Sequence, residues 1–294
     1  MLFLNENKSS EKDTNDAIIN ELDKMITDDE SIVAEDFDVF DGDAAGSMEL
    51  CLEMETSWDA LIMDMASIEH ASIVNEDEML LEGKMKSFWD TIVKWAKRVW
   101  VSISGFFKKA LNFITSHYKN AEKWIADNKD KIDEGKSVEF KCYDEVASGN
   151  ALKNIQTYMK SVKQGAEAIV NSAGAKSAGK EFKEENKDLL GKLDKRTVKV
   201  STLMGNIKGS NQGIADLKSS QAMMAAQLKK IINDANAAKN NAKSEDVKKA
   251  KELISARKKA LSLFQKATSR AIKSYSGVIS QSLTGVRKSL SEKK

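Results

Sequence analysis

The sequence predicts an all-α protein: an elongated helical bundle with a C-terminal antiparallel coiled-coil hairpin and at most one short strand or hairpin near residues 137–143. The 294 residues include no proline, so no pyrrolidine ring interrupts a helix anywhere in the chain. Charged residues make up 31% and aromatic residues only 6%, which suits long, thinly packed helices better than one large globular core. Apolar residues recur every three or four positions through most of the chain, which is the spacing of an amphipathic helix.

The charge of the chain changes sign between Glu82 and Gly83. Residues 1–82 hold 24 Asp and Glu against 3 Lys, a net charge of −21, whereas residues 83–294 hold 21 acidic against 43 basic residues, a net charge of +22. The small residues and two glycines of NSAGAKSAGK, at 171–180, indicate a linker. We therefore expect an acidic N-terminal segment over 1–82, an aromatic-rich amphipathic helical region over 83–170, a linker over 171–180 and a basic helical hairpin region over 181–294.

Two helices are expected in the acidic segment. The first begins near Thr14 or Asn15, and the second begins near Ser47. Because no Lys or Arg lies between Lys24 and Lys84, this segment should repel nucleic acid and attract either the basic remainder of the chain or a basic partner. The apolar stripe of the second helix consists of Cys51, Met54, Trp58, Leu61, Met65 and Ile68.

The stretch from Met79 to Ile125 carries the candidate functional residues. Residues 84–126 contain 9 Lys and Arg against only Asp90 and Glu122, and they hold 9 of the 19 aromatic residues. Such a stripe forms either the main core of a helical bundle or a surface that lies on a membrane. Gly105 is expected to kink or break the stretch into two helices. The stripe includes Phe88, Trp89, Ile92, Trp95, Val99, Trp100, Phe106 and Phe107.

Residues 137–143 show the one convincing alternation of period two, with Val138, Phe140 and Cys142 on one face. No second strand of matching quality is visible. The segment could pair in a small hairpin, join the edge of another subunit or form an extended connector. The last third of the chain predicts two helices, at about 212–243 and 245–290, that pack as an antiparallel hairpin with Lys-rich exposed faces.

No set of residues in the sequence points to catalysis, to a metal or to a cofactor. His70 and His117 lack the acidic, Cys or His neighbours of a zinc site, and Cys51 and Cys142 do not have the spacing of metal ligands. No combination of nucleophile, base and acid can be assembled. We therefore expect a protein that is not an enzyme and that carries neither cofactor nor metal.

An acidic N-terminal segment followed by a Lys-rich helical body resembles the internal head proteins of large tailed bacteriophages. In that family an acidic propeptide directs the protein into the procapsid core, and the prohead protease removes it after a Glu preceded, two positions earlier, by an apolar residue. Leu80-Leu81-Glu82 followed by Gly83 has this form and lies at the charge reversal. The resemblance implies synthesis in the host cytoplasm, a final location in the capsid interior, other virion proteins as partners, and a mature body over 83–294 packed beside DNA.

Other functions are consistent with the same residues. The net charge of +22 on residues 83–294 favours contact with the phosphates of DNA or RNA, independent of nucleotide sequence. A membrane-active protein would insert residues 84–126 into a bilayer surface after activation. A scaffolding oligomer would pair acidic and basic segments between subunits, and we expect a homo-oligomer.

Overall fold

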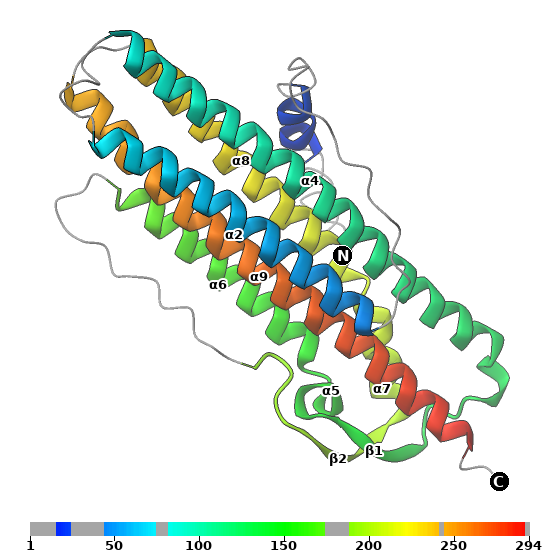
Figure 1. Ribbon diagram of the computed structural model, residues 1–294. Coiled ribbons are helices and arrows are strands. Elements are labelled where there is room, and N and C mark those ends of the chain that lie inside the picture. The colour runs from blue at the N-terminus through cyan, green and yellow to red at the C-terminus, as the bar shows by residue number, and fades with distance from the viewer. Residues whose placement is uncertain (1–15, 25–43, 75–81, 174–187, 241–243, 292–294) are drawn as a thin grey trace, which may run out of the picture.

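The computed structural model describes residues 16–24, 44–74, 82–173, 188–240 and 244–291. It is an elongated bundle whose long helices run side by side, with a small two-stranded sheet at one end (Figure 1). Within these ranges, the structure confirms the all-α fold class with at most one short hairpin. A short helix covers 16–24, and the long helices are α2 (Ala44–Val74), α4 (Glu82–Asp127), α6 (Ala151–Asn171), α8 (Gln212–Asn240) and α9 (Ser244–Ser291).

The C-terminal helix α9 is the central element of the bundle. It has 48 residues, so it is about 70 Å long at 1.5 Å per residue. It packs against α8, α6, α2 and α4, and Figure 1 shows it between α2 and α6. Its apolar stripe, which includes Phe264, Ile272, Tyr275 and Ile279, is buried. The expected helices at 212–243 and 245–290 correspond to α8 and α9, which pack on each other.

Helix α4 is continuous through Gly105, so the predicted break at this residue is wrong. The helix extends over 46 residues from Glu82 to Asp127, and Gly105 itself is buried. A glycine inside a helix costs only about 1 kcal/mol relative to alanine. The neighbouring Phe106 and Phe107 are both buried, and their burial contributes more than this cost.

The sheet pairs two segments that are far apart in the sequence. Strand β1 (Ser137–Tyr143) is antiparallel to β2 (Leu193–Lys199), with Ser137 opposite Lys199 and Tyr143 opposite Leu193. Of the three alternatives for 137–143, the structure shows pairing with another strand of the same chain. The two strands are separated in the sequence by α5 (Asp144–Ser148) and α6 rather than by a tight turn. The predicted alternation of β1 is confirmed, because Val138, Phe140 and Cys142 are buried.

Strand β2 lies inside the region that was expected to be a helical hairpin. Its sequence, LDKRTVK, buries only Val198, so it carries no apolar alternation from which a strand could be predicted. Register with β1 determines its structure, and it leads directly into α7 (Val200–Gly209). The sheet and α7 both pack against the C-terminal half of α9.

Some sequence predictions lie outside the described residues. These are Leu80 of the expected processing site and most of the expected linker at 171–180. Glu82 and Gly83 are the first two residues of α4. The division of charge between them therefore coincides with the start of a helix.

Candidate functional site: the contact between the acidic layer and the basic body

The acidic segment packs against the basic body within the same chain. We call the helix over 16–24 together with α2 the acidic layer, and residues 83–294 the basic body. Helix α2 contacts both α4 and α9 (Figure 1). The predicted apolar stripe of α2 faces inward, and Leu61 and Ile68 on it are half-buried. The buried side chains of α2 are Leu50, Cys51, Met54, Trp58 and Met65.

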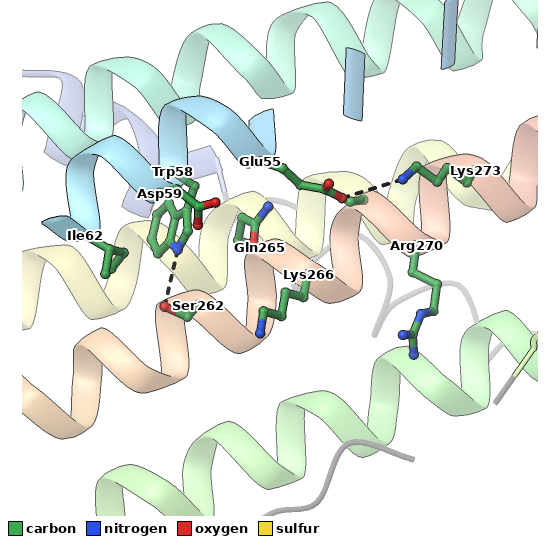
Figure 2. Close-up of a pocket in the computed structure, with 10 residues that line it drawn as sticks. Glu55, Trp58, Asp59, Ile62, Ser262, Gln265, Lys266, Arg270 and Lys273 are labelled. Atoms are coloured by element: carbon green, nitrogen blue, oxygen red, sulfur yellow. Dashed lines mark hydrogen bonds and ion pairs between the residues drawn. The ribbon is translucent and has the colours of Figure 1, made fainter. Parts of the chain in front are cut away.

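The contact with α9 is made through aromatic, sulfur and hydroxyl groups. The indole N–H of Trp58 donates to Ser262 Oγ at 3.2 Å, as Figure 2 shows, and the thiol of Cys51 donates to the carbonyl of Ser269 at 3.5 Å. The Ser269 hydroxyl donates in turn to the sulfur of Met54 at 3.4 Å. This side of the contact therefore combines apolar packing with three side-chain hydrogen bonds.

The contact with α4 joins cations of the body to carboxylates of the acidic layer. Arg98 Nη2 lies 2.7 Å from Asp64 Oδ2, and Lys109 Nζ lies 2.6 Å from Glu53 Oε1. The indole N–H of Trp95 donates to the carbonyl oxygen of Leu61 at 2.9 Å. One residue of the predicted aromatic stripe, Trp95, and two cations of α4 thus meet the acidic segment on one side of the helix.

The helix over 16–24 makes a second set of such contacts. Leu22 is completely buried, and the indole N–H of Trp100 donates to Asp23 Oδ1 at 2.6 Å. Lys229 of α8 lies 2.5 Å from Glu21 Oε2. Both parts of the acidic layer therefore accept an indole N–H and a lysine ammonium from the basic body.

Apolar burial holds the acidic layer more strongly than its ion pairs do. Arg98 and Asp64 have side chains that are 51% and 42% exposed, and exposed pairs of this kind contribute about 0.2–1 kcal/mol each. Burying a large apolar side chain contributes about 1.5–3 kcal/mol, and α2 buries five side chains. The apolar stripe therefore supplies most of the free energy of docking, and the ion pairs add a smaller part.

The aromatic stripe of α4 is almost entirely buried. Trp89, Trp95 and Phe107 have no exposed surface, Phe106 is 8% exposed, and Phe88 is half-buried on the same helix. The rings therefore belong to the packing of the bundle and of the acidic layer. The other members of the predicted set, Ile92, Val99 and Trp100, are buried as well.

A pocket of about 600 Å³ lies where α2 meets α9 (Figure 2). One wall carries the ring of Trp58 and the carboxylates of Glu55 and Asp59, and the opposite wall carries Lys266 and Lys273. Glu55 and Lys273 form an ion pair at 3.5 Å across the pocket. The pocket brings together charged groups of both signs.

The described residues contain no group of three or more His, Cys, Asp or Glu that could hold a metal ion. The ring of His117 lies in a packing contact, because its Nε2 is 3.0 Å from Ser280 Oγ and its ring stacks on Phe113. Burial raises the pKa of the Cys51 thiol to about 12 and also raises the pKa of Cys142. Both thiols are free, and burial keeps them protonated and poorly nucleophilic near neutral pH.

Within the described ranges, no helix is both long enough and apolar enough to cross a membrane. The fold and the site together define a class of protein: a helical bundle whose acidic layer covers a basic body. No family model, curated protein or solved structure matches the chain.

The sequence indicated the kind of contact but not its partners. The absence of Lys and Arg between residues 24 and 84 predicted an attraction for basic groups, and the stripe on α2 predicted its buried face. Sequence reasoning missed Arg98, Lys109 and Lys229 as contact residues, because they are three among 43 basic residues of the body. Only the folded chain shows which of these basic residues meet the acidic layer.

Proposed function

We propose that the chain is a non-enzymatic virion protein of a tailed bacteriophage, made as a precursor whose acidic segment is removed after Glu82. The mature body, residues 83–294, is then packed with DNA in the capsid interior together with other virion proteins. The observation that carries the proposal is the coincidence of three boundaries at one place: the charge reversal, the Leu-Leu-Glu sequence and the first residue of α4.

The contact between the acidic layer and the basic body supports this proposal. Residues 1–82 carry a net charge of −21, which lowers the net charge of the precursor to +1. Because the acidic layer also pairs with Arg98, Lys109 and Lys229, the precursor has little attraction for nucleic acid. Removal of residues 1–82 leaves a body with a charge of +22. Affinity for DNA phosphates then rises in a salt-dependent way that does not depend on sequence.

Mass spectrometry of purified mature particles tests the proposal. We expect a protein that begins at Gly83 and no peptides from residues 1–82. Leu80→Asp should leave the full-length chain in the particles, whereas Leu81→Asp, which changes the position that the cleavage sequence does not require, should be processed normally. Intact residues 1–82 in wild-type mature particles would refute the processing.

A further inference from the structure

Trp95, Arg98 and Lys109 of α4 contact α2, and Phe106 lies on the same side of α4. Trp95, Arg98, Phe106 and Lys109 fall within one quarter of the helical circumference at 100° per residue. We call these four residues the covered stripe. Trp95 and Phe106 are buried, whereas Arg98 and Lys109 extend to the carboxylates of Asp64 and Glu53.

Helix α2 supplies three kinds of partner to the bundle face that it covers. It gives carboxylate oxygens to Arg98 and Lys109, and a carbonyl oxygen to the indole N–H of Trp95. It also provides an apolar surface through its buried side chains, among them Leu50, Met54 and Met65. Any ligand that replaces α2 must satisfy the same cations, the same indole donor and an apolar surface.

The interface of an anionic lipid bilayer offers these same partners. Phosphates accept from Arg and Lys, oxygens at the headgroup level accept from an indole N–H, and the acyl boundary receives the apolar rings. Duplex DNA offers phosphates but no apolar layer into which the rings of Trp95 and Phe106 could be buried. The covered stripe therefore matches lipid better than nucleic acid.

We propose that the covered stripe is a binding surface for anionic membranes that α2 keeps closed. The inference rests on the proposed removal of the acidic segment, because after cleavage α2 is held only by noncovalent contacts and dissociates on dilution. The newly made full-length chain therefore does not bind lipid, and lipid binding begins only when the acidic layer is released. The face that opens is the side of α4 toward α2, not the side packed on α8.

Vesicle co-sedimentation of the full-length chain tests the inference without requiring cleavage. Glu53→Gln with Asp64→Gln removes the two carboxylates that face the covered stripe. We expect the fraction bound to phosphatidylglycerol-containing vesicles to rise about fivefold at low salt, with no rise on pure phosphatidylcholine vesicles. Adding Arg98→Gln and Lys109→Gln to this variant should return binding to the wild-type level.

The matched control is Glu49→Gln with Asp59→Gln, which changes the net charge of α2 by the same amount. Glu49 is exposed, and Asp59 lines the pocket on the α9 side, so neither carboxylate pairs with α4 among the described contacts. An equal rise in the control would overturn the inference, because net charge alone would then explain binding. A rise in binding to duplex DNA without a rise on vesicles would overturn it in favour of a phosphodiester partner.

Opening of α2 is measured in the same samples by labelling of the Cys51 thiol, which is buried against α9. If the double variant does not speed labelling, Trp58→Ala supplies a stronger opening. Faster labelling without anionic vesicle binding, in either variant, would refute the lipid surface. That result would leave the processing proposal intact, since only the particle experiment tests cleavage.

Discussion

Trp58→Ala should detach α2 from α9 while the basic body stays folded. The Trp58 side chain is 5% exposed, and its indole N–H donates to Ser262 Oγ. Truncating a buried aromatic residue to alanine costs about 3–5 kcal/mol. The ring borders the open pocket on α9, so water fills the space that it leaves, and we expect a cost near the lower limit of about 3 kcal/mol.

The assay compares two buried thiols in one chain. Cys51 lies on the buried face of α2, against α9, and Cys142 lies in β1 at the sheet end of the bundle. If α2 opens as a local unit, a loss of about 3 kcal/mol raises its opening equilibrium, and with it the Cys51 labelling rate, about 150-fold. Labelling of Cys142 should change less than about threefold, because β1 packs mainly on β2, α9 and α5 rather than on α2.

Met63→Ala is the control, because Met63 is on the same helix but 71% exposed, and its truncation should leave both labelling rates unchanged. Parallel acceleration of Cys51 and Cys142 would show that α2 opens only when the whole bundle unfolds. No acceleration of Cys51 would show that Trp58 does not hold the helix. Either outcome would refute the description of α2 as a separable layer.

Two further predictions concern stability. A Cβ atom at Gly213 would lie 2.9 Å from the Tyr275 ring, whose hydroxyl is tied to Asp216, so Gly213→Ala should lower the free energy of thermal unfolding by about 1–3 kcal/mol. Gly205→Ala, in a helix with no atom within 4 Å of the added carbon, should instead be neutral or stabilising by up to about 1 kcal/mol. Equal losses in both variants would contradict the packing argument. Because burial raises the pKa of Cys51 from 9.0 to about 12, the unfolded chain binds fewer protons between these values, and the free energy of unfolding measured in urea should fall as pH rises from 9 to 12. The slope from this group is at most about 1.4 kcal/mol per pH unit, and Cys51→Ala should remove that part; an unchanged slope would exclude Cys51 as its source.

Much of the helical framework follows from spacing along the chain. The stripes that predicted α2, α8 and α9 are local patterns, since residues three or four positions apart share a helical face in any context. The alternation in 137–143 predicted β1 for the same reason. The spacing also showed which face of α2 is buried, because the apolar residues of this helix lie on one face and only that face gains from removal from water.

Gly105 and β2 could not be predicted because their structures depend on contacts with distant residues. Gly105 lies within a continuous helix because packing on both sides outweighs a local preference of about 1 kcal/mol. Strand β2 has no alternation of its own, and pairing with β1, more than fifty residues earlier in the chain, determines its conformation.

The sequence by itself determined most of the long helices, one strand and the division of charge at Glu82, because these depend on residue type and local spacing. Only the tertiary structure decided where the acidic segment docks. Cys51 meets Ser269 across 218 residues, and Trp100 meets Asp23 across 77. Charge attracts any carboxylate to any of 43 cations at similar energy, whereas the shape of the apolar stripe on α2 fits only the surface formed by α4 and α9.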